Sequence, residues 1–355
     1  MTTQVEDFFA GPVAQLTQTL QRVQQSQVPS AEPSDDSVFE TVRAAIEECL
    51  VACKTLQSQI EDDVRLLRST QERFRAAIQP WFDQSWCMRH ALAKPRGYAG
   101  DYQMLTTVYD RQVKSLGLGG YLDRYFLQTE LGTSVPLRLK MARDFLIGES
   151  LRCRSLKILN IASGPGREYV GGWGLPDDCR VDVTCADLDD EAIAFVQQNV
   201  IPTLPPTMSM KMVRHNALKI GNVKMNHEAF GVPDVIYSVG LFDYIPDRLL
   251  VRMLGGLRET VAKSGVIYLA FKDCNFYDAT AYQWLVDWYF YQRTEAECRA
   301  LLAQAGYPVD ELEMTRDDTG SIINYICRQP PQDAADWSEE SETIDDAAPE
   351  LVTAE

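Results

Sequence analysis

Hydrophobic and polar positions follow two different patterns along this chain of 355 residues. Between residues 37 and 79, apolar side chains recur mostly every three or four positions, which places them on one face of a helix. Roughly 40 residues is long for a single globular helix, so we expect it to break or to form one arm of a helical bundle. Pro80 should end this helix or start the next one. Residues 81–146 continue as helices joined by glycine-containing turns.

From about residue 155 the pattern changes to short β-rich runs. Five of them alternate with helical stretches, at residues 155–162, 181–189, 210–218, 233–245 and 266–273. Residues 314–329 add two β-like pieces around a DDTG turn. Strands that alternate with helices predict a parallel sheet covered on both faces, and a final hairpin without an intervening helix predicts an antiparallel edge. The predicted fold class is therefore α/β, preceded by a helical domain.

These patterns divide the chain into four predicted parts. Residues 1–36 form an N-terminal segment and linker, 37–145 a helical substrate or lid domain, 146–330 the α/β domain, and 331–355 an acidic tail. The last 25 residues contain nine acidic side chains and no Lys or Arg, which is typical of disorder. Without them the formal net charge changes from -17 to -8, because 42 acidic residues then face 34 basic ones.

Composition excludes several classes of protein. The negative net charge argues against general binding to nucleic acid, which requires a basic surface. Nine cysteines without a Cys-x-x-Cys pair indicate reduced thiols in a cytoplasmic protein, and the three histidines lie outside zinc-ligand spacing. The acidic start is unlike a signal peptide, and no apolar run approaches the ~20 residues of a membrane span. We expect no metal and no stable membrane insertion.

The strongest local signal is a glycine-rich loop, SGPGRE at 163–168, between a predicted strand and a predicted helix. Such a loop lets a ligand approach the backbone, and the helix N-terminus offers free N–H groups. Asp187 ends the next strand about 21 residues after Gly166, where a carboxylate can accept hydrogen bonds from ribose hydroxyls; it could instead cap the following helix. Tyr169 stands at the third glycine position of a dinucleotide motif, which weakens that interpretation.

These residues resemble the class I S-adenosylmethionine (SAM)-dependent methyltransferases. The first motif of that family corresponds to LNIASGPG at 159–166, with Asn160 where the family usually has an acid. The resemblance implies a Rossmann-like methyltransferase sheet with SAM as cofactor. HNAL would border the adenine, and YSVGLFDY would lie beneath the methionine moiety. The implied cofactor residues are Ala162, Ser163, Gly164, Pro165, Gly166, Asp187, Leu188, Asn216, Ala217, Ser238, Val239 and Gly240.

A narrower resemblance covers more of the chain. KPRGYAGDY at 94–102, ASGPGRE at 162–168 and GLFDYIPD at 240–247 are similar to the bacterial extracellular factor (3-hydroxypalmitic acid methyl ester) biosynthesis methyltransferases. The late pattern Trp288, Arg293, Thr294 and Glu297 belongs to the same resemblance. That family makes a fatty-acid methyl ester used as a cell-density signal. The resemblance therefore implies methyl transfer to the carboxylate of a small acid such as a 3-hydroxy fatty acid.

The segment at 94–102 is the predicted lid. Tyr98 and Tyr102 offer aromatic faces that can stabilise a sulfonium cation, and Arg96 can bind a substrate carboxylate. The alternative is an ordinary turn with solvent-facing charges. An ionised carboxylate needs no general base, whereas a phenol or amine would more often need one. His90 is the candidate base, with a structural histidine as the alternative.

The end of the fourth strand provides the other candidates. Phe242, Asp243 and Tyr244 could face the transferred methyl group, although Asp243 or Asp247 could instead cap the next helix. The aromatic stretch 276–293 either packs in the core or lines an acyl pocket, with Trp288 in its wall and Arg293 as the anion partner. The predicted catalytic residues are Tyr98, Asp243, Tyr244, Arg293 and His90. The predicted substrate-binding residues are Arg96, Tyr98, Phe242, Trp288 and Arg293, with Tyr98 and Tyr102 also contacting the cofactor.

Two alternatives to carboxylate methylation stay open. The acceptor could be the oxygen or nitrogen of another small metabolite, or the chain could bind SAM as a regulatory protein without turnover. In each case we expect a small-molecule ligand and no nucleic acid as partner, and a homodimer is left open.

Overall fold

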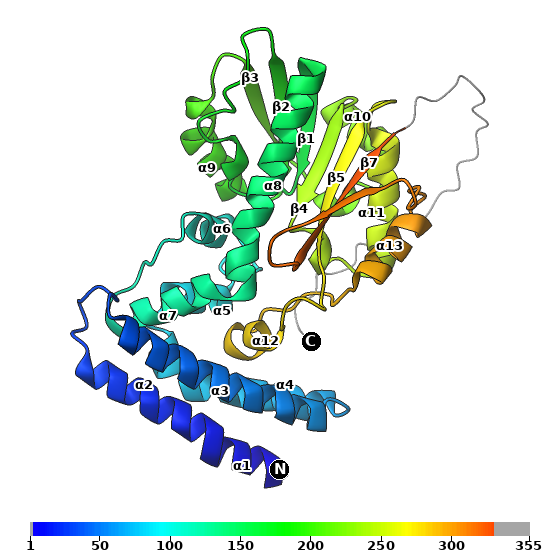
Figure 1. Cartoon of the computed structure of the whole chain (residues 1–355). Helices are drawn as coiled ribbons and strands as arrows, with labels where there is room; N and C mark the ends of the chain where they lie inside the picture. The colour runs from blue at the N-terminus through cyan, green and yellow to red at the C-terminus, as the bar shows by residue number, and fades with distance from the viewer. Residues whose placement is uncertain (1–2, 330–355) are drawn as a thin grey trace. The chain divides into compact units, whose positions relative to one another are not determined.

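The computed structural model describes residues 3–329 and consists of two compact units (Figure 1). The helical unit comprises the chain up to Val135 together with Tyr277–Tyr289. The α/β unit comprises Pro136–Phe276 and the chain from Phe290 onward. The predicted acidic tail at 331–355 lies outside the described residues.

The helical unit is built around one apolar core. Its elements are α1 (Thr3–Phe8), a π-helical turn η1 (Phe9–Val13), α2 (Ala14–Ser26), α3 (Asp36–Ile60), α4 (Val64–Phe82), α5 (Trp86–Ala93), α6 (Tyr102–Tyr109), α7 (Gly117–Gln128) and α12 (Thr280–Val286). The predicted apolar face of residues 37–79 supplies much of this core, including Val42, Ile46 and Phe74. Burial of that face holds α3 and α4 against the other helices.

The long helix breaks at residues 61–63, which is one of the two predicted outcomes, and Asp63 caps α4 by accepting the Leu66 N–H at 3.0 Å. One prediction for this unit needs correction, because Pro80 does not end α4, which continues to Phe82. Within the predicted N-terminal segment and linker, residues 3–26 are helical, and their apolar side chains are buried in the same core as those of α3.

The aromatic stretch after the fifth strand adds α12 to this core. Trp284 is fully buried and makes edge contacts with Phe8 at 5.7 Å and with Phe74 at 5.5 Å between ring centroids. Trp288 packs against Phe126 and Tyr282 in the same unit. Of the two interpretations of residues 276–293, core packing accounts for the part that lies in the helical unit, at Tyr277–Tyr289.

The α/β unit contains one seven-stranded sheet in the order β3-β2-β1-β4-β5-β7-β6. Its strands are β1 (Ser155–Ile161), β2 (Arg180–Asp187), β3 (Met208–Arg214), β4 (Val235–Val239), β5 (Val266–Lys272), β6 (Glu313–Arg316) and β7 (Ile322–Arg328). The first five strands pair in parallel, whereas β7 is antiparallel to both β5 and β6. This arrangement confirms the predicted fold class, an α/β fold with a mostly parallel sheet and an antiparallel end, preceded by a helical region.

Helices cover both faces of the sheet (Figure 1). One face packs on α8 (Glu130–Cys153) and α9 (Asp190–Asn199), and the other on α10 (Val223–Phe230), α11 (Asp247–Thr260) and α13 (Glu295–Gln304). The units divide at Val135 rather than at the predicted residue 145, because Ala142 and Leu146 of α8 belong to the core under the sheet.

Two neighbouring glycines of α11 provide a test of this packing. A Cβ on Gly256 would lie 2.2 Å from the Ile220 carbonyl oxygen, whereas a Cβ on Gly255 would lie 3.9 Å from its neighbour, the Ala305 carbonyl oxygen. We expect Gly256→Ala to lower the free energy of unfolding by about 1–3 kcal/mol through overpacking. Gly255→Ala should raise it by about 0.5–1 kcal/mol through helix propensity. Urea unfolding of both variants measures the difference, and equal stabilities would contradict the close approach at Gly256.

Candidate functional site

The glycine loop lies at the carboxyl end of β1 and bends toward the end of β2. Ala162, Gly164 and Gly166 have φ values of 54°, 53° and 58°, so three positions of the loop are left-handed. The Gly164 N–H donates to Asp187 Oδ2 at 2.7 Å. For Ala162 this conformation is sterically unfavourable, and such strain is often stored at binding sites. The predicted loop and the predicted acid are therefore in direct contact.

The helix predicted after the loop is absent from the described chain at that position. Arg167–Tyr169 form a single 3-10 turn, η2. Gly171, Gly172 and Gly174 follow with φ values between 63° and 73°, which interrupts a helix. The helix N-terminus expected to supply free N–H groups therefore does not form, and an anionic group near the loop needs another partner.

Asp187 is buried at the end of β2 and does not cap α9. Its Oδ1 accepts the Asp189 N–H at 3.0 Å, and Asp189 is the residue that caps α9 through the Glu191 N–H. Burial raises the pKa of Asp187, and the backbone hydrogen bonds from Asp189 and Gly164 oppose that shift. The next side chain, Leu188, is 46% exposed. At this end of β2, the carboxylate of Asp187 is thus followed by the exposed apolar side chain of Leu188.

A buried carboxylate stands next to Asn160, at the position where the family usually has an acid. Asn160 Nδ2 donates to Glu168 Oε1 at 3.0 Å, and the Tyr237 hydroxyl donates to the same oxygen. The hydroxyls of Tyr237 and Tyr169 lie 2.6 Å apart. Burial raises the pKa of Glu168, while the hydrogen bonds from Tyr237 and Asn160 oppose the shift. The carboxyl group of Glu168, at the end of the glycine loop, therefore lies beside Asn160, where the resemblance implies an acidic residue.

The other predicted cofactor residues lie at the ends of β3 and β4. Asn216 accepts the Leu218 N–H at 2.9 Å and caps the 3-10 turn η4 (Ala217–Lys219). The Ser238 hydroxyl donates to the Ile161 carbonyl at 2.8 Å, which ties β4 to β1. Gly240 has a φ of 93° and directly follows β4, whose Tyr237 pairs with Asn160 of β1. These residues surround the same strand ends as the glycine loop.

The structure changes the roles predicted for Phe242 and Asp243. Both belong to the 3-10 turn η5 (Phe242–Tyr244) and are buried. Phe242 stacks on Phe271 at 5.4 Å in the core on the α11 side of the sheet, so it lines no substrate site. Asp243 accepts the backbone N–H of Lys272 at 2.9 Å and forms an ion pair with its Nζ at 2.5 Å. Asp243 therefore neither caps α11 nor offers a free carboxylate, and Tyr244 is half-buried against Phe290.

Arg293 holds the η5 turn rather than an anionic substrate. Its Nη1 donates to the Phe242 carbonyl at 2.9 Å, its Nη2 donates to the Ile245 carbonyl, and it forms an ion pair with Asp247. The buried guanidinium is thus occupied by protein partners, and Arg293 is a positioning residue. Thr294 and Glu297 form the capping box of α13. The late sequence pattern is accounted for by these structural contacts.

The remaining predicted residues belong to the helical unit. Tyr98 is 39% exposed, and Arg96 and Tyr102 are half-buried in the same segment. Asp101 caps α6 by accepting the Met104 N–H, and His90 Nε2 lies 2.8 Å from Asp101 Oδ2. His90 also stacks on Trp86 at 4.4 Å. These contacts favour the structural interpretation of His90. Tyr98 and Arg96 lie between α5 and α6, and their roles in a lid stay predictions.

Two buried basic residues near the strand ends escaped the sequence analysis, Lys272 and Arg138. Lys272 ends β5, whose residues are all buried, and a run such as VIYLAFK could have indicated a lysine inside the protein. Arg138 lies in the first half of α8, where nothing in the local pattern separates it from the surface arginines of the same helix.

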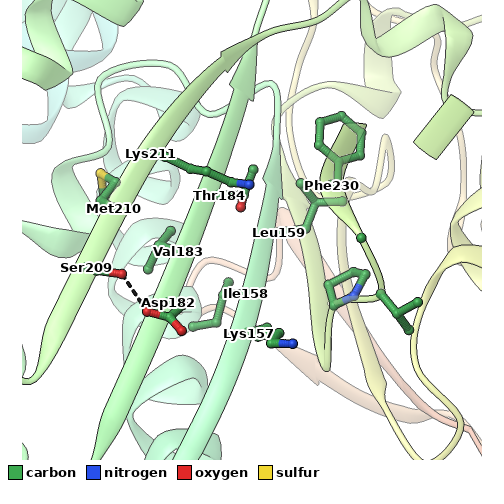
Figure 2. A pocket seen from close by; sticks show the side chains of 13 residues that line it. Lys157, Ile158, Leu159, Asp182, Val183, Thr184, Ser209, Met210, Lys211 and Phe230 are labelled. Carbon is green, nitrogen blue, oxygen red and sulfur yellow. Dashed lines mark hydrogen bonds between the residues drawn. The ribbon is translucent and has the colours of Figure 1, made fainter. Parts of the chain in front are cut away.

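A groove of about 420 Å³ lies elsewhere on the sheet. It spans the first halves of β1, β2 and β3, and Figure 2 shows Asp182 accepting the Ser209 hydroxyl on its floor. The glycine loop and Asp187 do not line it.

Among residues 3–329, no group of three or more His, Cys, Asp or Glu side chains is placed to hold a metal ion. No helix of that same range is long and apolar enough to cross a membrane.

Comparison with one solved structure supports the fold. A possible exported protein from Bordetella parapertussis matches with 16% identity and a TM-score of 0.52, over 92% of this chain and 97% of that one. The SAM-dependent methyltransferase SibL in its apo form matches with 13% identity and a TM-score of 0.43, over 92% and 96%. Magnesium protoporphyrin IX methyltransferase from Synechocystis PCC 6803 with bound SAM matches with 13% identity and a TM-score of 0.40, over 56% and 83%. No protein-family model and no curated protein matches the sequence.

The Asp243–Lys272 pair should be essential to stability. Asp243→Asn leaves a buried ammonium without its carboxylate, and we expect the free energy of unfolding to fall by about 3–5 kcal/mol. Replacing both residues by apolar ones, Asp243→Leu with Lys272→Met, should restore most of that loss. Urea unfolding compares the three proteins, and a single variant as stable as the wild type would contradict the pairing.

The raised pKa of Glu168 predicts that the stability of the folded protein depends on pH. Because burial raises its pKa above the ordinary 4.5, the folded state holds a proton that the unfolded state releases, so stability falls as pH rises through this window. Glu168→Gln keeps an acceptor for Asn160 and Tyr237 but cannot ionise. Its stability relative to wild type should increase above pH 4.5, by about 1.4 kcal/mol for each unit by which the folded pKa exceeds that value. Urea unfolding at several pH values measures this difference, and a constant difference would show that Glu168 does not titrate abnormally.

Proposed function

We propose that this chain is a SAM-dependent methyltransferase that methylates the carboxylate of a small acid, such as a 3-hydroxy fatty acid, to a methyl ester. The observation that supports this proposal most is the 2.7 Å hydrogen bond between the Gly164 N–H and Asp187. It joins a glycine loop and an acidic residue at neighbouring strand ends of a methyltransferase-like sheet. A nucleoside cofactor uses this combination, with ribose hydroxyls bound by the acid.

The residues at these strand ends fit SAM. Each oxygen of Asp187 accepts one backbone N–H, and a carboxylate oxygen can accept a further hydrogen bond from a ribose hydroxyl. Gly164 and Gly166 allow the ligand to approach the backbone. Exposed Leu188 would pack against the adenine beside Asn216 and Ala217, and the end of β4 would border the methionine moiety.

The chemistry requires little of the protein beyond placement. Bound SAM supplies a methyl group on a sulfonium, an intrinsically good leaving group. The chain must align the acceptor with that methyl group and exclude water. An acceptor carboxylate is ionised at pH 7 and needs no base.

The acceptor class rests on the narrower resemblance. The segment at 94–102 supports it, and Arg96 and Tyr98 of this segment are the residues we assign to the acceptor carboxylate and to the lid. The late pattern from Trp288 to Glu297 adds no support for this acceptor, because its side chains serve packing, turn geometry and a helix cap. The use of the product as a cell-density signal is part of the same proposal.

Incubation with methyl-labelled SAM and a panel of acids, phenols and amines tests the function. We expect label in a base-labile product of 3-hydroxy fatty acids, and loss of transfer in Asp187→Ala. Asp182→Ala is the matched control, because Asp182 lies on the same strand but contacts Ser209 in the groove. A base-stable labelled product would identify a different acceptor. Binding of S-adenosylhomocysteine without any turnover would instead identify a regulatory protein.

A further inference from the structure

Arg138 of α8 is a buried cation at the carboxyl ends of the strands. The residue is 3% exposed. A Cβ on Gly240 would lie 2.8 Å from both terminal nitrogens of its guanidinium, so the guanidinium lies directly against the backbone of Gly240. Gly240 directly follows β4, which pairs with β1 up to Asn160, three residues before the glycine loop. Arg138 thus reaches the strand ends where the cofactor residues gather.

The guanidinium has no partner within the described chain. Its Nε is buried without a hydrogen bond, and no carboxylate of residues 3–329 forms an ion pair with it. The other buried charges at this end of the sheet have direct partners, since Lys272 pairs with Asp243 and Glu168 accepts from Asn160 and Tyr237. The positive charge of Arg138 lowers the pKa of Glu168, but the two side chains form no ion pair. A buried cation without an anion in direct contact is unfavourable. The guanidinium therefore lacks an anion within hydrogen-bond distance.

The groups around Arg138 are polar and come from several strands. Its positive charge acts on Lys272, whose pKa is lowered by burial, raised by Asp243 and lowered further by Arg138. It also acts on Tyr268, whose hydroxyl is buried without a hydrogen-bond partner in the described residues. The carbonyl oxygen of the Asn324 side chain is likewise buried and unpartnered. This face of the sheet, under α8, carries unsatisfied polar atoms beside an unmatched positive charge.

We propose that Arg138 binds the α-carboxylate of the methionine moiety of SAM. A planar guanidinium suits a carboxylate, because it can donate two parallel hydrogen bonds. The absence of a helix after the glycine loop removes the usual backbone donors for an anion there. The guanidinium lies against Gly240, which belongs to the segment that the methyltransferase resemblance places beneath the methionine moiety. This inference rests on the proposed function, since it requires SAM as the ligand.

Calorimetry with two ligands tests the assignment without any turnover. S-Adenosylhomocysteine carries the carboxylate, whereas 5′-methylthioadenosine lacks the whole amino acid part. We expect Arg138→Gln to weaken binding of S-adenosylhomocysteine on the order of 10- to 100-fold, the effect of losing charge-assisted hydrogen bonds, and to leave binding of methylthioadenosine unchanged. Arg138→Lys keeps the charge but loses the planar guanidinium. Its affinity for S-adenosylhomocysteine should lie between those of the wild type and of Arg138→Gln.

Stability separates a binding role from a structural one. Arg143 of the same helix donates to the carbonyls of Glu168 and Gly172, each at 2.6 Å, so Arg143→Gln is the matched structural control. We expect Arg143→Gln to lower the melting temperature of the unliganded protein, and Arg138→Met to leave it unchanged or raise it. A lower melting temperature for Arg138→Met would overturn the view that this charge is unmatched.

The remaining outcomes are also decisive. If Arg138→Gln weakened the binding of both ligands equally, or of neither ligand, the assignment to the methionine carboxylate would be overturned. A raised KM for the acid with unchanged cofactor binding would assign Arg138 to the acceptor instead. If the wild-type protein bound neither adenosyl ligand, the proposed function itself would fail, which is distinct from a failure confined to Arg138.

Discussion

The arrangement of this chain depends on satisfying buried polar groups at the place where parallel strands end. Beyond the last strand residues the ladder hydrogen bonds stop, and each buried N–H, carbonyl or charge needs another partner. Asp187 accepts a hydrogen bond from the backbone of the glycine loop, and Asp243 forms an ion pair with Lys272. Arg293 donates hydrogen bonds to the carbonyls of the η5 turn. These side-chain contacts determine the shape of the strand ends and so position the candidate site.

The fold could be predicted from the sequence because helices and strands each impose a characteristic spacing of apolar residues. Spacing of apolar residues identified the amphipathic helix of residues 37–79, and alternating β-rich and helical runs identified the sheet. The helix expected after the glycine loop was wrong for a local reason. Three glycines at 171, 172 and 174 take left-handed conformations, and their presence in REYVGGWGLP was the signal that a helix could not continue.

The roles of individual side chains were less accessible, because motif spacing does not fix the direction in which a side chain points. Phe242 and Asp243 follow a strand end, as expected of site residues, yet the η5 turn directs both into the interior. Arg293 was expected to bind an anion, and its donors are instead used by backbone carbonyls. Lys272 and Glu168 were missed because a charged residue in a sequence is usually at the surface, and only three-dimensional packing shows that these two are buried.

The insertion of Tyr277–Tyr289 into the helical unit affects how the protein is made. The chain leaves the α/β unit after Phe276, supplies α12 with its buried Trp284 to the helical core, and then returns. A ribosome releases the first 135 residues long before α12 is synthesised. The helical core therefore remains incomplete, with apolar surface of α3 and α4 uncovered, until β1 to β5 have also emerged. Neither unit corresponds to one uninterrupted stretch of the chain, so the helical core can be completed only after Tyr277–Tyr289 has been synthesised.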